Sequence, residues 1–155
     1  MRKTRAKKRL ILPDPKFGQT RITQFVNNLM LGGKKEKAFN LFYDAVEIIK
    51  ERTSEDGVET WEKALQNITP QVEVRSRRIG GATFQVPRPI RDERKESMGM
   101  KWLIAAARKR NEKGMALNLA SEIIAGAKEE GAAYKKKEDT HRMAEANKAF
   151  SHFRF

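Results

Sequence analysis

Residues 70–91 read PQVEVRSRRIGGATFQVPRPIR, and this stretch predicts a β-hairpin in the middle of the chain. Gly80 and Gly81 can both take the positive φ angles that a two-residue hairpin turn requires, and residues typical of strands flank them. A loop of this length fixes the cross-strand pairs, which are Ile79 with Ala82, Arg77 with Phe84 and Arg75 with Val86. The chain is therefore expected to carry a two-stranded ribbon over residues 72–89.

Neither face of this ribbon is apolar throughout. Its first strand is crowded with arginines, and no acidic residue follows Glu73 to balance them. Burial of either face would strand guanidinium groups, so we expect the ribbon to project from the body and to be supported from outside the fold. A solvated surface hairpin is the plainer alternative. We favour a nucleic-acid contact, with Phe84 stacked on a base or sugar.

Apolar residues recur at helical spacing in six segments outside the ribbon. The first begins near residue 21 and ends at Gly32 and Gly33, and the others cover residues 34–52, 58–68, 92–109, 115–130 and 134–149. Asp92 is expected to cap the fourth helix. The pattern predicts a mainly α fold, a six-helix bundle with an inserted β-hairpin arm, formed by a single domain of 155 residues.

Two tryptophans fall on apolar helical stripes, and we expect both of them in the core. Trp61 lies on the third helix. Trp102 shares the apolar residues of the fourth helix with Met98, Ala105 and the neighbouring pair at residues 103–104.

The first twelve residues predict a disordered basic N-terminal arm. Arg and Lys dominate residues 1–9, which carry too little apolar surface to fold alone. A solubilising tail is the alternative, but we favour an arm that becomes ordered on phosphates. Pro13, Asp14 and Pro15 then predict a stiff, extended connector.

The composition bounds the class of protein. A formal net charge of +13 and a pI of about 10.2 predict a polyanionic partner. The chain has no cysteine, which excludes a disulfide frame, a cysteine zinc site and a thiol nucleophile. The sequence has no apolar run long enough to span a membrane, and the stretch after the basic N-terminus is too short for a signal peptide. We therefore expect a cytoplasmic protein that has no membrane partner.

Constellations typical of enzymes are weak in this sequence. His141 has acidic neighbours, but a helical histidine among lysines is more often a surface or phosphate-contacting group. Gly32 and Gly33, followed by two lysines, lack the spacing and hydroxyl residue of a nucleotide-binding loop. We expect no catalysis, no metal site and no cofactor. A cryptic nuclease that uses His141 and Glu138 stays open as an alternative.

Basic residues gather instead in six clusters along one small domain, which is a strong signal for nucleic acid. Structured RNA, bound by shape and phosphates, suits scattered patches better than DNA sequence readout, although a DNA-compacting architectural protein would share the charge. The candidate RNA-binding residues are Arg2, Lys3, Arg5, Lys7, Lys8, Arg9, Lys34, Lys35, Lys37, Arg75, Arg77, Arg78, Arg94, Lys95, Lys101, Arg108, Lys109, Arg110, Lys113, Lys136, Lys137 and Arg142.

Four stretches carry a resemblance along almost the whole chain. They are PDP at residues 13–15 leading to FVNNLM at 25–30 and GKK at 33–35, VEVRSRRIGGATFQVP at 72–87, KWLIAAARKR at 101–110 and KKEDTHRMAEANKAF at 136–150. The sequence resembles the bacterial type of the seventh small-subunit ribosomal protein family, whose fold is a helical bundle with a ribbon arm.

The resemblance implies a structural constituent of the small ribosomal subunit, active in translation and not an enzyme. It implies a primary binder of ribosomal RNA that nucleates assembly of the subunit head and acts as a single copy, not a homo-oligomer. It also implies a place at the subunit interface near the exit-site tRNA and mRNA, beside the ninth and eleventh small-subunit ribosomal proteins. The ribbon residues expected near the tRNA and mRNA are Arg77, Arg78, Gly80, Gly81, Thr83 and Phe84.

Overall fold

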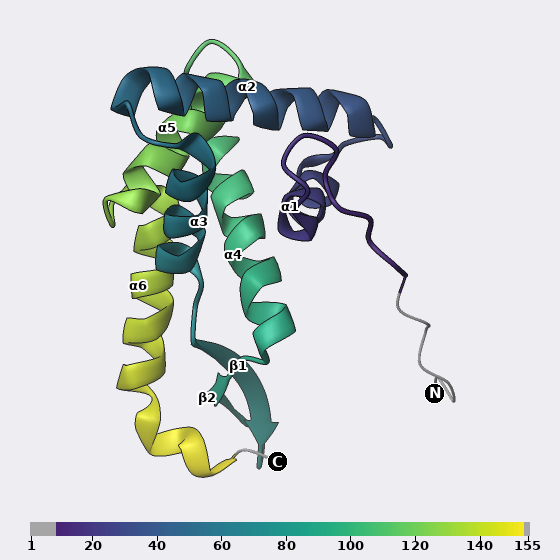
Figure 1. The fold of residues 1–155 in the computed structure, drawn as a ribbon. Coiled ribbons are helices and arrows are strands. Elements are labelled where there is room, and N and C mark those ends of the chain that lie inside the picture. The colour runs from purple at the N-terminus through teal and green to yellow at the C-terminus, as the bar shows by residue number, and fades with distance from the viewer. Residues whose placement is uncertain (1–8, 154–155) are drawn as a thin grey trace.

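The computed structural model describes residues 9–153 and confirms the mainly α fold (Figure 1). Most of the predicted basic arm therefore lies outside the described residues. The elements, in chain order, are α1 (Thr20–Leu29), α2 (Lys35–Thr53), α3 (Gly57–Ile68), β1 (Val72–Ile79), β2 (Ala82–Pro89), α4 (Asp92–Ala107), α5 (Met115–Ala127), α6 (Gly131–Ala146) and the short 3-10 helix η1 (Lys148–Phe153). Helix α2 lies across one end of the body, and the ribbon lies at the other end beside η1 (Figure 1).

The N-terminal capping residue of α3 is an aspartate, whereas the one predicted for α4 is wrong. Asp56 caps α3, because its Oδ1 accepts the backbone N–H of Val58 at 2.7 Å and that of Glu59 at 3.3 Å. The prediction that Asp92 caps α4 is wrong, since the extended residue before the helix is Arg91. Asp92 lies in the first turn instead, where a carboxylate still interacts favourably with the helix dipole.

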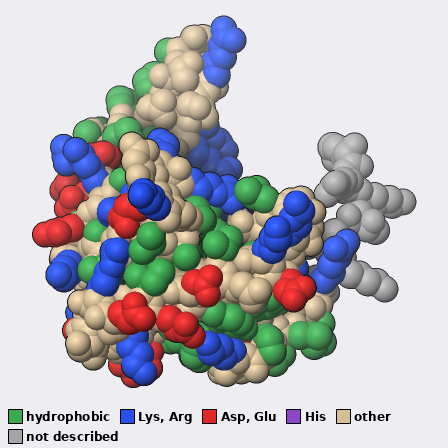
Figure 2. All heavy atoms as spheres, turned by 90° about the horizontal axis from the view of Figure 1, so that it is seen from above, with side chains coloured by type: hydrophobic (Ala, Val, Ile, Leu, Met, Phe, Trp, Pro, Cys, Tyr) green, Lys and Arg blue, Asp and Glu red, His purple; other side chains and the backbone are tan. Residues whose placement is uncertain are grey.

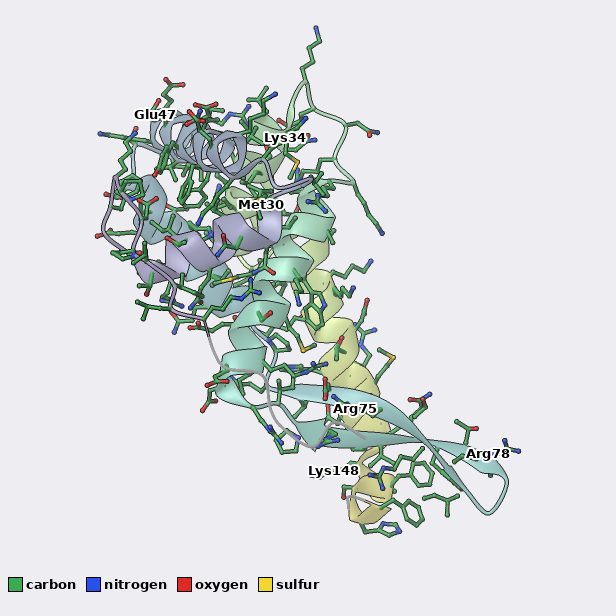
Figure 3. The ribbon with its side chains drawn as sticks, turned by 90° about the vertical axis from the view of Figure 1, so that its right-hand side faces the viewer. Met30, Lys34, Glu47, Arg75, Arg78 and Lys148 are labelled. Carbon is green, nitrogen blue, oxygen red and sulfur yellow. The ribbon has the colours of Figure 1, made fainter. Side chains whose placement is uncertain are left out.

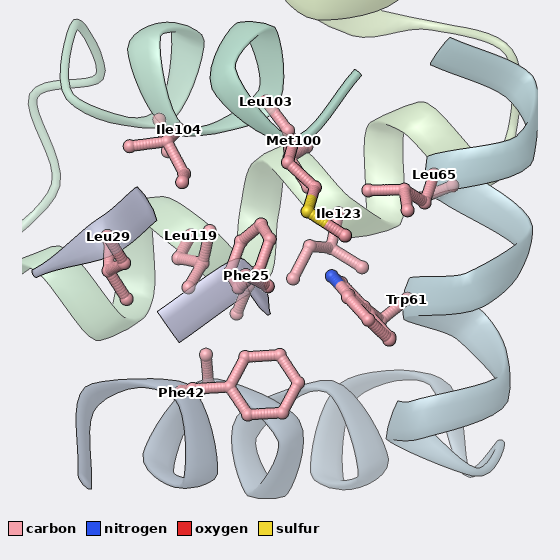
Figure 4. Packing of buried hydrophobic residues seen from close by; sticks show 14 of the residues in the cluster. Phe25, Leu29, Phe42, Trp61, Leu65, Met100, Leu103, Ile104, Leu119 and Ile123 are labelled. Carbon is pink, nitrogen blue, oxygen red and sulfur yellow. The ribbon is translucent and has the colours of Figure 1, made fainter. Parts of the chain in front are cut away.

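The core is centred on three aromatic side chains from three helices. Phe25 of α1, Phe42 of α2 and Trp61 of α3 are each 0 % exposed, and their ring centroids lie 5.4–5.5 Å apart (Figure 4). Leu119 and Ile123 of α5 complete this centre (Figure 4). Edge-on and tilted aromatic pairs add about 0.5–1.5 kcal/mol each to the free energy gained by burial. The core position predicted for Trp61 is confirmed.

Helix α4 buries only part of the apolar set predicted for it, namely the pair at residues 103–104. Its buried residues include Met100, Leu103 and Ile104, whereas Trp102 is half-buried and Ala105 is exposed. Gly99 lies close to the residue after α3, because a Cβ atom on it would lie 2.8 Å from the Thr69 Oγ1 atom. A glycine here therefore lets α4 pass close to the end of α3.

The ribbon has the predicted register. Arg77 pairs with Phe84 and Arg75 with Val86, and both turn glycines have positive φ angles, 56° at Gly80 and 88° at Gly81. The expectation that its support comes only from outside the fold is wrong. Both strands contact α6, and β2 also packs against η1.

Phe84 is part of that internal support. Its ring lies 5.2 Å from the ring of Phe150 and 5.5 Å from that of Phe153, measured between centroids. We call Phe84, Phe150 and Phe153 the aromatic clasp. The predicted last helix ends early, at Ala146, and the chain then turns into η1, which carries both partner rings to the ribbon. Phe84 therefore packs against two rings of its own chain, whereas the sequence predicted that it stacks on a base or sugar of a nucleic acid.

The predicted connector at residues 13–15 leads directly into a turn at residues 15–17. Asp14 is 2 % exposed, and its Oδ2 accepts the backbone N–H groups of Lys16 and Phe17 at 3.1 and 2.8 Å. Its Oδ1 accepts the Tyr43 hydroxyl at 2.5 Å. Burial, followed by this hydrogen bond, raises the pKa of Tyr43 to about 12. The turn thereby anchors the start of the described chain to α2.

Candidate nucleic-acid interface

The base of the ribbon is built on one buried carboxylate. Glu73 is 8 % exposed, and it accepts hydrogen bonds from Arg75 Nε at 2.8 Å and from Arg94 Nη2 at 3.1 Å. This contact joins β1 to the first turn of α4. Two guanidinium groups share one carboxylate, so the site keeps a net positive charge. Arg75 and Arg94 are half exposed and can still face a phosphate.

The tip of the ribbon presents an exposed basic surface. Arg77, Arg78, the two turn glycines and Thr83 are all exposed. Figure 3 shows Arg78 at the far end of the ribbon, well beyond Arg75 and the helices. Within residues 9–153, Arg78 forms no hydrogen bond or ion pair, and a guanidinium in this state is available for an anionic partner.

A second basic surface lies at the opposite end of α4. Arg108 Nη2 donates to the Leu29 carbonyl at 3.1 Å, which brings the loop after α4 beside the turn after α1. We call the exposed lysines of this region the loop corner, and they are Lys34, Lys35, Lys37, Lys109 and Lys113. Lys35 Nζ also lies 5.7 Å from the centroid of the Phe39 ring. Two predicted clusters that are distant in sequence thus meet in space.

Arg110 has a structural role that sequence reasoning missed. Its Nε donates to Glu122 Oε2 at 2.6 Å, and Glu122 is only 1 % exposed. The other oxygen of Glu122 accepts the backbone N–H of Ala133 at 2.9 Å, which ties α5 to α6. A glutamate within an amphipathic helix normally faces solvent, so no local signal distinguishes Glu122. Removing one partner of such a buried pair typically costs about 3–5 kcal/mol.

The lysines of α6 differ in their surroundings. Lys136 Nζ lies 5.3 Å from the centroid of the Trp102 ring, a surface cation–π contact. Lys137 Nζ donates to the Asn67 carbonyl at 2.6 Å and so stabilises the end of α3. Lys136 is exposed and suits an anionic partner, whereas Lys137 is half-buried and already engaged.

Three further residues predicted to bind RNA lie on α4 and α6. Lys95 Nζ pairs with Asp92 Oδ1 at 2.9 Å, and Arg142 Nη2 lies 3.5 Å from Asp139 Oδ1. Lys101 is exposed on α4. The predicted arm residues Arg2, Lys3, Arg5, Lys7 and Lys8 lie outside the described residues, and Arg9 is the first one described.

His141 takes part in the fold at the start of the ribbon. Its Nε2 accepts the backbone N–H of Gln71 at 3.1 Å. Burial, followed by the positive charge of Lys137, lowers the pKa of His141 below its ordinary value of 6.5. The neutral ring is therefore favoured as the acceptor. Within residues 9–153, no group of three or more histidine, aspartate or glutamate side chains could hold a metal ion.

One group of exposed acidic residues lies away from the ribbon tip. We call the exposed acids of the second half of α2 and the start of α3 the acidic side, and they are Asp44, Glu47, Glu51, Glu55, Asp56 and Glu59. Figure 3 labels Glu47 and Arg78 at opposite ends of the molecule, and Figure 2 shows acidic side chains spread over the body. This separation favours one orientation of a polyanion and disfavours its approach to the acidic side.

A helical body with a basic ribbon, a basic loop corner and an opposed acidic side defines a small basic protein suited to RNA. The family described as ribosomal protein S7p/S5e matches residues 1–148. The chain is 63% identical over 155 residues to the small ribosomal subunit protein uS7 of Cytophaga hutchinsonii. Identity to the proteins of that name is 63% over 158 residues in Flavobacterium johnsoniae and 61% over 158 residues in Porphyromonas gingivalis. All three matches cover 100% of both chains.

The chain therefore belongs to the S7p/S5e family of ribosomal proteins. A member of this family is a structural protein of the ribosome and not an enzyme, so the predicted ribosomal role in translation is confirmed. Its place is the small subunit of the cytoplasmic ribosome. Within residues 9–153, no helix is both long and apolar enough to cross a membrane.

Proposed function

We propose that this protein is a primary binder of small-subunit ribosomal RNA and nucleates assembly of the subunit head. One observation carries the proposal, namely that the lysines of the loop corner and Arg78 of the ribbon are exposed and form no ion pairs within residues 9–153. They lie at the two ends of one surface formed by α1, α4 and the ribbon (Figure 3). Such a surface can contact several phosphates of a folded RNA at once.

A salt-dependence experiment tests this proposal. Lys35→Ala and Lys113→Ala should each weaken binding to small-subunit ribosomal RNA, because each removes a cation that neutralises a phosphate. The slope of log K against log salt should become shallower by about 0.7–0.9 for each phosphate that is no longer neutralised. Lys50→Ala is the matched control, because Lys50 is also exposed but lies among residues of the acidic side. Equal slopes for all three variants and the unmodified protein would refute an interface at the loop corner.

We further propose that the ribbon reaches the exit-site tRNA and mRNA at the subunit interface. Exposed Arg77, Arg78 and Thr83 support this proposal, since Arg78 lies at the far end of the ribbon, beyond the helices (Figure 3). The aromatic clasp aims the ribbon in a fixed direction. The ninth and eleventh small-subunit ribosomal proteins are the proposed neighbours, and the chain is proposed to act as a single copy.

The two rival functions predict different observations. A DNA-compacting protein would prefer duplex DNA over structured ribosomal RNA at the same salt concentration in a mobility-shift assay. A nuclease that uses His141 and Glu138 would release cleavage products from RNA with added metal. The contact between His141 and Gln71 favours a structural histidine, because the Nε2 lone pair of His141 is already occupied.

A further inference from the structure

A cleft of about 990 Å³ opens between residues 9–12 and the helices α1 and α4. It lies on the proposed RNA surface, since Lys35 of the loop corner forms part of its wall. Ile11, Leu12 and Met100 contribute apolar surface to the same wall. A concave site of this volume with apolar walls is large enough for a small planar ligand.

Two free amide side chains line this cleft from one turn of α1. Gln24 and Asn27 both belong to the wall, three positions apart on the helix. Neither side chain forms a hydrogen bond within residues 9–153. Asn28 is different, because its Nδ2 donates to the Gln24 carbonyl at 2.9 Å. A carboxamide offers one donor and one acceptor side by side, and this pattern is complementary to N1 and the N6 amino group on the Watson–Crick edge of an unpaired adenine.

The hydroxyl group of Thr23 is a second polar group of the cleft that has room for a partner. It lines the same cleft and is only 3 % exposed, yet its Oγ1 has no hydrogen-bond partner within residues 9–153. Buried hydroxyl groups in folded proteins are nearly always satisfied, so an unpaired one calls for a partner. A polar ligand atom that entered the cleft could supply it.

Two cations of the cleft can contact a nucleotide. Arg9 and Lys35 both belong to its lining and can contact the phosphates on either side of an inserted base. Glu93 and Glu96 also line the cleft, and Arg21 Nη2 lies 3.0 Å from Oε1 of Glu96 and offsets its negative charge. A strand of RNA that runs from the loop corner towards the ribbon would cross the cleft opening.

We propose that this cleft holds one unstacked adenine of the bound RNA, paired with the amides of Gln24 and Asn27. The proposal rests on the proposed RNA-binding function and deepens it, because it adds a base-reading subsite to a surface that otherwise contacts phosphates. Unstacked bases are the usual targets of sequence-specific RNA recognition, whereas paired bases in a helix are hidden from side chains.

Chemical probing of small-subunit ribosomal RNA tests the subsite directly. Dimethyl sulfate reports whether adenine N1 is accessible, and hydroxyl radicals report protection of the backbone. The full-length protein is compared with the double variant Gln24→Ala/Asn27→Ala. We expect an adenine that the unmodified protein protects to become reactive with the variant, while backbone protection persists at saturating protein. Affinity should fall about tenfold, the size expected when one amide–adenine pair is removed.

The matched control is Asn40→Ala/Gln66→Ala, which removes two exposed amides that lie outside the cleft. It should leave both the adenine protection and the affinity unchanged. Circular dichroism of both double variants checks that they fold. Identical adenine reactivity with all three proteins, together with full backbone protection, would overturn the subsite and leave the proposed function intact. Absence of backbone protection by the unmodified protein would overturn both.

Discussion

The helical core and the ribbon have different roles within one chain, since the core stabilises the fold and the ribbon exposes basic groups. The core around Trp61 is fully buried, and its side chains contact one another from α1, α2, α3 and α5. The ribbon buries little beyond its base, and its arginines remain exposed along the strand that leads to the turn. Stability thus comes from one region, and the groups suited to RNA are concentrated in another. Changes that affect one region should leave the other nearly unaffected.

The strongest test of this separation is removal of the core tryptophan. Trp61→Ala should lower the free energy of unfolding by about 3–5 kcal/mol, because a fully buried aromatic ring leaves a large cavity. Urea unfolding followed by circular dichroism measures the change. Trp102→Ala is the control, since Trp102 is half-buried, and it should cost clearly less. Equal destabilisation by the two variants would show that the core does not centre on Trp61.

The pair formed by Arg110 and Glu122 tests whether a predicted RNA contact belongs to the stabilising region. Arg110→Met should lower the free energy of unfolding by about 3 kcal/mol, because it leaves the nearly buried Glu122 carboxylate without its counter-ion. The salt slope of RNA binding should stay unchanged at a temperature where the variant is fully folded. Arg108→Met is the control, since the exposed Arg108 should affect the slope more than the stability. A shallower salt slope for Arg110→Met would show that Arg110 contacts RNA phosphates after all.

Local patterns predicted most of the fold, because helix periodicity and turn chemistry act over a few residues. The hairpin register follows directly from the two glycines, and the six helices follow from their apolar spacing. The full set of buried residues of α4 could not be predicted in this way. It includes Gly99, which lies against Thr69, and such a contact between residues distant in sequence leaves no local pattern.

The sequence predicted which types of residue form the candidate RNA interface. It predicted only in part which of them are free to bind RNA and which stabilise the fold. Charge density identified the basic surfaces, because exposed lysines and arginines dominate the sequence near the loop corner and the ribbon. Burial separated Arg110 and Lys137 from the other candidates, since their partners, Glu122 and the Asn67 carbonyl, come from other elements. Single-sequence patterns carry no information about such tertiary partners.

The aromatic clasp is the point where the two regions meet, and it should have an intermediate effect. Phe84→Ala should lower the free energy of unfolding by about 1–2 kcal/mol, less than a core ring, because Phe84 is half-buried. A double-mutant cycle with Phe153→Ala should give a coupling energy of about 0.5–1.5 kcal/mol, as expected for an aromatic pair. Additive effects of the two changes would mean that η1 does not hold the ribbon in solution.

Shortening the ribbon should have the smallest effect on stability and the most specific effect on function. Replacing residues 77–83 by a minimal turn removes exposed residues apart from the half-buried Ile79 and leaves Phe84 in the clasp. Surface changes of this kind usually alter the free energy of unfolding by about 0.5 kcal/mol or less.

Incorporation into small subunits should persist, somewhat weakened by the removal of Arg77 and Arg78, because the loop corner is untouched. Exit-site tRNA binding per assembled subunit should fall, since the shortened ribbon can no longer reach the tRNA. Both quantities can be measured side by side on purified subunits that carry the shortened ribbon. If incorporation collapses while exit-site tRNA binding per subunit stays normal, the ribbon is an assembly anchor, and the separation between a docking body and a reaching ribbon is wrong.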